Sequence, residues 1–410
     1  RWAYAFRSRN EAWPPPQVAA DVVQIGDLVR VKRGIDHWEL GQVPDIQGAL
    51  VSISPANGQI LALVGGYDFR WNQVNRVLSP RPPGSNFKPF VYGAALEAGL
   101  SASSTVNDAP FSRGDYRPNN YENNFLGTIT LRQALKESRN IPTVRLFDKL
   151  GSNQVLSFAN RLGIRTQDFP RNDLTVALGS ADVQPLEMVT AYAALANGGF
   201  KVDPWFIDKI STEADGVLYR ASPAEVCENC GGQISGAEPA VVAAPRVLDA
   251  RIAFIMNSML RSVVEEGSGA RVQRELQRSD LMGKTGTTNG PQELWFSGFN
   301  RDVATTVFVG FDQPQPLGER EQGATVAVPI WIDFMRDALA ETPEVTMNRP
   351  DGIVDRLVDT RSGAPATPGT ENSMFEYFRE ELAPQPATDG VPGGDIEGKE
   401  GEELSTEIIF

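Results

Sequence analysis

The residues of this sequence with the clearest chemical potential are a serine and a lysine spaced three apart. Ser85 follows the helix-breaking run Pro82 to Gly84, and apolar residues then recur at near-helical spacing, which predicts a helix beginning close to Ser85. Lys88 would share a face of that helix with the serine. Because a serine hydroxyl becomes nucleophilic when a neighbouring base takes its proton, the pair predicts covalent catalysis by Ser85.

We expect the base to be lysine rather than histidine. The single histidine, His37, lies in an alternating stretch that we interpret as a small accessory module. A lysine can act as a base near neutral pH when burial and a nearby cation lower its pKa to ~7–8. Backbone N–H groups at the start of the helix would also suit an oxyanion. Alone, Ser-x-x-Lys is a weak motif, since a capping serine and a solvated lysine give the same pattern.

Two patterns further along the chain supply candidate partners. Ser138 and Asn140 fall on a predicted loop between two helices, directly after a short helix over residues 131–138. The second pattern is a predicted strand that carries Lys284, Thr285, Gly286, Thr287 and Thr288. A helix-ending loop and a bend in an ordinary strand would explain each pattern by itself. These two patterns are the downstream candidates for partners of the Ser85 and Lys88 pair.

Length and charge restrict the class of protein. With 410 residues, 41% of them hydrophobic, the chain can form two or three domains with a sizeable core. A formal net charge of -14 argues against a nucleic-acid partner, because no basic excess is available to neutralise phosphates. No run approaches the ~18 apolar residues needed to span a bilayer, and the N-terminus does not read as a signal peptide. These observations do not exclude a membrane anchor upstream of Arg1.

The two cysteines form a lone Cys-x-x-Cys, Cys227 and Cys230. A zinc site would need about four ligands, and no second pair is present. No βαβ pattern surrounds the motif, which argues against a thioredoxin-like redox pair. A small loop disulfide and two free surface thiols both remain open. We expect neither a metal nor a cofactor.

The pattern of strands and helices predicts an α+β fold. Residues 1–47 alternate like the strands of a small, partial β-barrel of OB type. Residues 48–66 predict a hairpin about the turn Asn57-Gly58, with both strands central in a covered sheet. Three strand candidates within residues 280–311 predict an antiparallel meander, against which a final helix over residues 326–340 would pack.

Capping residues and breakers mark further helices. The predicted helices are 131–138 capped by Thr130, 152–162 capped by Ser152 and stopped by Gly163, 185–197 opened by Pro185, and 249–267 capped by Asp249. The Pro-, Asn- and Gly-rich passage 106–127 is long and irregular, which is typical of a segment lining a groove. Beyond about residue 348 the chain is rich in Pro, Gly and Glu, and we expect disorder towards Phe410. The predicted division is therefore 1–47, 48–345 and a tail, 346–410.

Longer segments carry a family resemblance. They are PPGSNFKPFVYGAALEAG, LRQALKESRNIPTVRL, VALGSADVQPLEMVTAYAALANGG and MGKTGTTNGPQELWFSGFN. Together they resemble the transpeptidase domain of class A, bifunctional penicillin-binding proteins of the 1A type over residues 48–345, and residues 1–47 resemble the OB-like module of Gram-negative members. The resemblance implies the penicillin-binding transpeptidase and serine β-lactamase-like fold, with a central antiparallel sheet packed by helices. Such proteins also carry a glycosyltransferase domain and a transmembrane helix, so we expect the chain to be part of a longer protein.

The resemblance also implies roles for the first three motifs. Ser85 would attack the penultimate D-Ala carbonyl of a peptidoglycan stem peptide, with Lys88 as base and Lys284 as the second cation that disfavours charge on it. Ser138 would relay the proton towards the leaving nitrogen. Asn140 would hold a peptide group of the substrate.

The predicted strand would complete the site. Thr285 and Thr287, with Lys284 nearby, would bind the terminal carboxylate, and Gly286 would allow an extended peptide to approach the strand. Thr288 would also bind substrate. The backbone N–H groups of Ser85 and Thr287 would form the oxyanion hole. An acceptor amino group would then attack the acyl-enzyme and form the cross-link, and β-lactams would acylate Ser85.

Other functions fit the same scaffold. A serine β-lactamase or D,D-carboxypeptidase would hydrolyse the acyl-enzyme, but the Leu-Asn dipeptide that accompanies the deacylating glutamate of class A β-lactamases does not occur here. A β-lactam sensor without enzymatic activity would need only acylation. The family resemblance further implies an inner-membrane protein with a periplasmic catalytic body. By the same resemblance, lipoprotein activators and elongation-machinery proteins would be partners.

Overall fold

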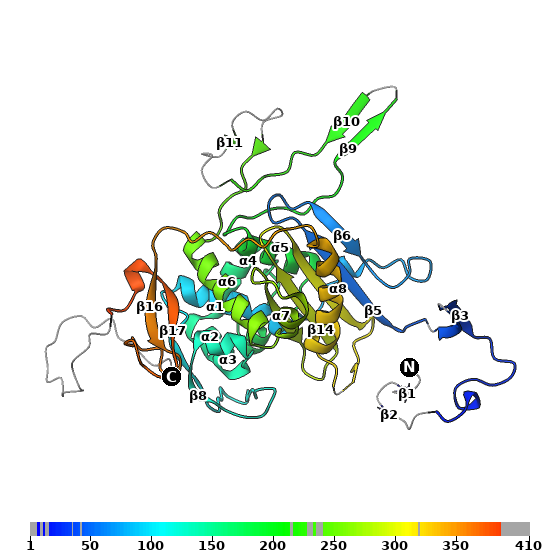
Figure 1. The fold of residues 1–410 in the computed structure, drawn as a ribbon, viewed down its shortest axis with the longest axis horizontal. Coiled ribbons are helices and arrows are strands. Elements are labelled where there is room, and N and C mark those ends of the chain that lie inside the picture. Colours follow the sequence, from blue (N-terminus) through cyan, green and yellow to red (C-terminus); the bar gives the residue numbers. More distant parts are fainter. Residues whose placement is uncertain are drawn as a thin grey trace.

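A five-stranded antiparallel sheet is the framework of the molecule (Figure 1). The structure is a computed structural model that describes residues 6–8, 11–12, 16–34, 36–41, 43–213, 216–227, 233–234, 241–318 and 320–386. The sheet order is β13-β14-β15-β5-β6. Its strands are β5 (Ile46–Ile53), β6 (Ile60–Val64), β13 (Met282–Thr287), β14 (Glu293–Phe299) and β15 (Ala304–Phe311). The predicted meander is confirmed. Strand β5, which precedes it by more than 200 residues in the sequence, pairs with β15, the last strand of the meander.

The hairpin that opens the sheet confirms one prediction and corrects another. Strands β5 and β6 pair in antiparallel register across the turn at Gly58, which has a positive φ of 78°. Strand β6, however, lies at the edge of the sheet, and its Leu61, Leu63 and Val64 are exposed. The expectation of two central strands is therefore wrong for β6, because apolar content alone does not distinguish a covered strand from an edge strand.

Helices cover both faces of the sheet. The α-helices are α1 (Lys88–Glu97), α2 (Leu131–Lys136), α3 (Asn140–Leu150), α4 (Ser152–Leu162), α5 (Pro185–Ala196), α6 (Ala250–Glu265), α7 (Arg271–Leu276) and α8 (Val328–Ala338). Side chains alternate across strand β14, so Trp295 joins the core that contains α1, α5 and α6, whereas Phe296 packs edge-on against Trp331 of α8. Helix α1 lies at the centre of the first core and is buried from Lys88 to Leu96.

Short helical turns connect these elements. They are the 3₁₀ helices η2 (Ala19–Asp21), η3 (Arg76–Leu78), η4 (Gly84–Phe87), η5 (Leu174–Leu178) and η7 (Glu380–Leu382), and the π-helical turn η6 (Gly323–Ala327) before α8. The helix predicted to begin close to Ser85 thus starts as the 3₁₀ turn η4 and continues as α1.

Most predicted helix ends are confirmed. Thr130 accepts a hydrogen bond from Gln133 N, and Asp249 accepts one from Arg251 N, as capping side chains do. Pro185 is the first residue of α5. Two predictions are wrong by a residue or two: Ser152 is the first residue of α4 rather than its cap, and Asn140 begins α3 rather than lying on a loop. Pro142 does not prevent this start, because the first N–H groups of a helix lack intrahelical partners.

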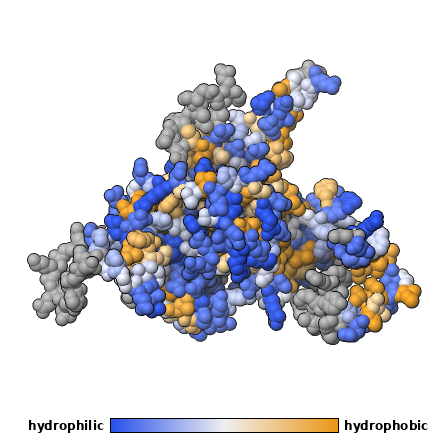
Figure 2. Space-filling model, in the orientation of Figure 1, coloured by the Kyte–Doolittle hydropathy of each residue, from blue (hydrophilic) through white to orange (hydrophobic). Residues whose placement is uncertain are grey.

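Smaller two-stranded sheets surround the main body. They are β1 (Phe6–Ser8) with β2 (Glu11–Ala12), β3 (Arg30–Arg33) with β4 (Trp38–Gly41), β7 (Thr105–Asp108) with β8 (Gly127–Thr130), β9 (Lys209–Thr212) with β10 (Gly216–Arg220), and β11 (Gln233–Ile234) with β12 (Val241–Val242). Hairpin β9–β10 extends away from the body (Figure 1). Figure 2 shows a mostly hydrophilic body with hydrophobic side chains gathered over the N-terminal residues, where Ile25, Leu28 and Trp38 are exposed.

The segment around the cysteine motif is only partly described. Cys227 is disulfide-bonded, and Cys230 lies outside the described residues. Within the described part of the chain, no group of His, Cys, Asp or Glu side chains could hold a metal ion. None of the described helices is long and apolar enough to cross a membrane.

Part of the expected tail is folded. Strands β16 (Ile353–Asp359) and β17 (Ser373–Arg379) form a full antiparallel hairpin at one end of the molecule (Figure 1). This corrects the expectation of disorder for these residues, because a few apolar side chains in a polar segment suffice to pack a hairpin against the body: Val358 and Phe378 are buried on one face and Ile353 on the other. Residues 387–410 lie outside the described residues.

One buried ion pair attaches this hairpin to the body. Arg132 of α2 donates to both carboxylate oxygens of Glu376 on β17, and Arg132 also donates to Ser258 and Ser262 of α6. Arg132 and Glu376 are 7% and 1% exposed. A bidentate arginine–carboxylate pair shielded from water is therefore the main polar contact between the hairpin and the helices.

We expect Glu376→Ala to lower the free energy of unfolding by about 3–5 kcal/mol, because it leaves the buried guanidinium of Arg132 unpaired. Denaturant unfolding measures the effect. The control is Glu266→Ala, which removes an exposed partner of Lys136 and should cost no more than about 1 kcal/mol. Equal effects of the two substitutions would show that the pair does not attach the hairpin.

Candidate active site

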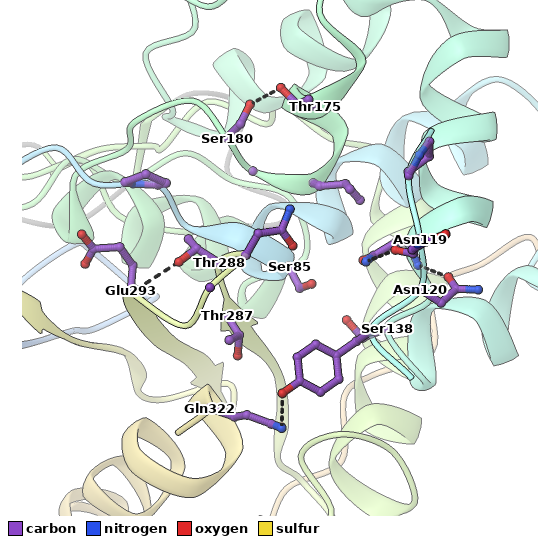
Figure 3. A pocket seen from close by; sticks show the side chains of 18 of the residues that line it. Ser85, Asn119, Asn120, Ser138, Thr175, Ser180, Thr287, Thr288, Glu293 and Gln322 are labelled. Atoms are coloured by element: carbon purple, nitrogen blue, oxygen red, sulfur yellow. Dashed lines mark hydrogen bonds between the residues drawn. The ribbon is translucent and has the colours of Figure 1, made fainter. Parts of the chain in front are cut away.

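A cleft of about 810 Å³ opens between the start of α1, the turn before α3 and the edge strand β13 (Figure 3). Its wall includes six of the predicted site residues: Ser85, Ser138, Asn140, Thr285, Thr287 and Thr288. Lys88 and Lys284 lie beneath this surface with 0% exposure. The irregular passage that we expected to line a groove supplies one wall, including Asn119 and Tyr121.

The Ser85 turn is held tightly against strand β13. Asn86 donates from Nδ2 to Lys284 O at 3.0 Å, and its own carbonyl accepts from the hydroxyl of the buried Tyr192 at 2.9 Å. Gly84 has a positive φ of 54°, and a Cβ there would lie 2.6 Å from Thr287 O. The absence of that side chain allows the backbone of the nucleophile to lie beside the backbone of the strand.

Gly286 serves the same contact from the strand side. A Cβ at this position would lie 2.5 Å from Pro83 O and 2.9 Å from the Cβ of Asn86. The expected role of Gly286 is to let an extended substrate approach the strand. The geometry shows that the Ser85 turn already requires it, because any side chain would separate the turn from β13.

Lys88 is surrounded by acceptors from the turn before α3 and from the first residue of that helix. Its Nζ donates to Asn140 Oδ1 at 2.7 Å, to Arg139 O at 3.1 Å and to Ser138 O, and it lies 3.3 Å from Ser138 Oγ. Burial lowers the pKa of Lys88 well below its usual value, and the nearby Lys284 amine lowers it further. A neutral amine at the floor of the cleft is the form that can accept a proton.

Ser138 joins the two buried amines. Its Oγ accepts a hydrogen bond from Lys284 Nζ at 2.8 Å, and the same oxygen lies within hydrogen-bond distance of Lys88. Ser138 has a positive φ of 57°, an uncommon conformation for a residue with a side chain. Burial lowers the pKa of Lys284 to about 7. The three groups form a chain along which a proton can move without leaving the protein.

The hydroxyls of strand β13 are fixed by neighbouring segments. Thr285 Oγ1 lies 2.8 Å from Ser268 Oγ, Thr287 Oγ1 accepts from Gly323 N at 3.0 Å, and Thr288 Oγ1 accepts from Glu293 N at 3.1 Å. Strand β13 is the last strand of the sheet and pairs only with β14 among the strands that the structure describes, so its other edge can pair with an extended chain.

Sequence reasoning missed several residues of the cleft. Ser268 follows α6 and is brought to Thr285 only by the packing of that helix on β13. Gln322 Nε2 donates to Tyr121 OH at 2.9 Å, which connects the irregular passage with the segment before α8 (Figure 3). Tyr121 was recognisable as an aromatic residue in that passage, but no local signal marks Ser268 or Gln322.

Glu293 is the least expected residue of the cleft wall. Its carboxylate is 1% exposed, neither oxygen has a hydrogen-bond partner in the described structure, and Arg81 Nη1 lies 3.5 Å from Oε1. Burial raises the pKa of Glu293 to about 7, against the attraction of Arg81. The folded protein therefore favours the protonated carboxyl.

This pKa gives a pH dependence of stability. The raised pKa makes the folded state bind a proton that the unfolded state releases above pH 4.5, so this contribution to stability falls as pH rises from about 4.5 to 7. Between pH 5 and pH 8, the unfolding free energy of the Glu293→Gln variant should fall by less than that of the wild type, by on the order of 2–3 kcal/mol. Denaturant unfolding at the two pH values measures this difference. The control, Glu371→Gln at an exposed position, should leave the fall unchanged. An undiminished fall in the Glu293 variant would contradict the assignment.

Two family models match the chain. The penicillin binding protein transpeptidase domain matches residues 48–336, and the penicillin-binding protein OB-like domain matches residues 1–46. The chain is 42% identical to penicillin-binding protein 1A of Pseudomonas aeruginosa and 35% identical to that of Escherichia coli, over 97% and 98% of its length. It spans about half the length of these relatives, 53% and 55%.

Solved structures agree with this relationship. Penicillin-binding protein 1A from Haemophilus influenzae superimposes with a TM-score of 0.82 and 33% identity, over 90% of this chain and 58% of that chain. PonA1 from Mycobacterium tuberculosis in complex with penicillin V gives a TM-score of 0.65 and 25% identity. The match covers 81% of this chain and 86% of that chain. The predicted α+β transpeptidase fold with an OB-like module is thereby confirmed. The chain belongs to the penicillin-binding proteins, as the transpeptidase portion of a class A member of the 1A type.

Proposed function

We propose that this chain is a peptidoglycan D,D-transpeptidase that cross-links stem peptides through an acyl-enzyme on Ser85. The observation that carries the proposal is the arrangement of two buried amines, Lys88 and Lys284, around the single hydroxyl of Ser138, beneath the cleft that Ser85 lines. A binding module has no use for two desolvated lysines. An acyl-transfer enzyme needs groups that accept and return a proton.

Acylation would proceed from the residues already described. Ser85 Oγ attacks the carbonyl carbon of the penultimate D-Ala as Lys88 takes the hydroxyl proton. The tetrahedral oxyanion is held by the N–H groups of Ser85 and Thr287, each such donor being worth about 3–4 kcal/mol of barrier. The proton passes through Ser138 to the nitrogen of the terminal D-Ala, the C–N bond breaks, and the free amino acid departs. The products are an ester on Ser85 and D-Ala.

The free edge of β13 supports the binding of a linear peptide. Main-chain hydrogen bonds along Lys284 to Thr287 would align the donor stem peptide as an added strand. The hydroxyls of Thr285 and Thr287, with Thr288 beyond them, suit its terminal carboxylate. Asn140 lies on the opposite wall, and its amide would hold a peptide group of the substrate.

The second half of the reaction separates transpeptidation from its alternatives. In the proposed cycle an amino group of a neighbouring stem peptide attacks the Ser85 ester and forms a new amide. A D,D-carboxypeptidase or β-lactamase would instead direct water to the ester, and a β-lactam sensor would leave the ester in place. Incubation with donor and acceptor stem peptides decides among these, since cross-linked dimers arise only from the first.

We extend the proposal to the longer protein by similarity to the 1A relatives. It would carry a peptidoglycan glycosyltransferase, be anchored in the inner membrane of a Gram-negative cell and hold this portion in the periplasm. Lipoprotein activators and elongation-machinery proteins would be its partners. We further propose residues 1–47, 48–345 and 346–410 as its units within this chain.

The nucleophile is tested directly by mass. We expect the protein to gain the mass of one penicillin on exposure to the drug and the Ser85→Ala variant to gain none, because only the hydroxyl can open the β-lactam ring. Intact-mass spectrometry measures the adduct. A variant that still gains the drug mass would exclude Ser85 as the nucleophile.

The base is tested by rate. Lys88→Ala should lower the acylation rate by about 10²–10⁴-fold, which is the usual contribution of a positioned base. Stopped-flow measurement with a fluorescent penicillin gives the rate. Lys149→Ala, which removes an exposed lysine of α3, serves as control and should acylate as fast as the wild type. An unchanged rate in the Lys88 variant would assign the base elsewhere.

A further inference from the structure

Helix α3 begins at a place set by a remote side chain. Its first two N–H groups, those of Asn140 and Ile141, donate to Asn120 Oδ1 at 2.9 and 3.2 Å. Arg139, the residue before the helix, provides no side-chain cap. Asn120 belongs to the irregular passage between β7 and β8. A side chain of the passage, rather than one next to the helix, therefore accepts the hydrogen bonds of the first N–H groups of α3 and fixes the position of Asn140.

A buried carboxylate holds this cap in place. Asp108, the last residue of β7, is 0% exposed. It accepts hydrogen bonds from Asn120 Nδ2 at 2.7 Å, from Arg139 Nε at 2.8 Å and from Leu126 N at 3.1 Å, and Arg139 Nη2 lies 2.7 Å from Oδ2 in an ion pair. Three hydrogen bonds and the ion pair with Arg139 stabilise a charge that would otherwise be costly to bury. Asp108 thus connects the cap residue Asn120 with Arg139.

These contacts continue to the amine of Lys88. Arg139 O and Asn140 Oδ1 both accept from Lys88 Nζ, and Ser138 lies immediately before them in the chain. We propose that Asp108 and Asn120 are positioning residues for acylation, which hold the turn Ser138–Asn140 so that its acceptors orient the amine of Lys88. The inference rests on the proposed function and assigns roles to residues outside the three motifs.

The same cluster surrounds Lys88 with charge from every side. Lys284 on β13 and Arg139 lower the pKa of Lys88, whereas Glu122 of the passage and Asp108 raise it. Removing the carboxylate charge of Asp108 should therefore lower the pKa of Lys88 further. Acylation requires the neutral amine. The acid limb of the pH profile of the acylation rate should therefore move to lower pH. A change that only loosens the fold would leave the limb in place.

The test compares two buried aspartates with similar partners. Asp108→Asn changes the proposed positioning residue. Asp280→Asn is the matched control, because Asp280 is 3% exposed, accepts two hydrogen bonds from Arg278 and one from Asn300, and lies outside the cleft wall. The second-order rate of acylation by a fluorescent penicillin is measured across pH, together with the melting temperature of each variant.

We expect Asp108→Asn to acylate at least tenfold more slowly than the control near neutral pH, with the acid limb shifted to lower pH. We expect Asn120→Ala to acylate at least threefold more slowly with the limb unchanged, because that substitution removes a cap and no charge. Rates within twofold of the control in both variants would overturn the inference. Should Asp108→Asn fail to fold, the rate of Asn120→Ala decides alone.

The wild type and Ser85→Ala separate this inference from the proposed function. Acylation of the wild type alone supports Ser85 as nucleophile whatever the Asp108 and Asn120 variants do. If the wild type is not acylated, the proposed function fails first. If it is acylated and both variants react at the control rate, only the positioning role fails.

Discussion

Two buried amines that share one hydroxyl are the constraint on which the site depends. Lys88 and Lys284 are 0% exposed, and Ser138 Oγ lies within hydrogen-bond distance of both. Desolvation makes charge on each buried amine unfavourable, and the nearby Lys284 lowers the pKa of Lys88 further, so the site favours neutral amines. The burial of apolar side chains in the core, where α1 is buried from Lys88 to Leu96, offsets the free energy of desolvating these amines. The nucleophile's helix is thus also the centre of packing.

Close backbone contact explains how three distant motifs reach one volume. Gly84 and Gly286 lack the side chains that would separate the Ser85 turn from β13, and Asn86 donates to the carbonyl of Lys284 across that contact. The sheet gives β13 a fixed register through β14, while no strand of the described residues pairs with its other edge. The rigid strand and the nucleophile's turn therefore form one unit, and the turn Ser138–Asn140 approaches that unit from the helical side.

Local signals predicted those parts of the fold that depend on neighbours in sequence. The helix start at Ser85, the cap of α2 by Thr130 and the hairpin turn at Gly58 are encoded within a few residues. Contacts between distant segments were not predictable. Whether β6 is an edge strand depends on which strand follows it in space, and the β16–β17 hairpin is anchored by an ion pair that spans 244 residues. For the site, the motif residues were recognisable, whereas Asp108, Ser268 and Gln322 carry no local pattern.

The two walls of the cleft differ in how they are fixed, and the difference follows from their chemistry. The β13 wall is held by a ladder of backbone hydrogen bonds, which any sequence of suitable strand residues can form. The opposite wall is irregular and has no such ladder, so side chains must satisfy its backbone groups. Asp108 accepts from Leu126 N, and Asn120 accepts from the N–H groups of Asn140 and Ile141. A hydrophobic contact of the same size would bury the turn but would not orient its carbonyl groups. Hydrogen bonds are directional, so they hold these carbonyl groups in the one orientation that faces the amine of Lys88.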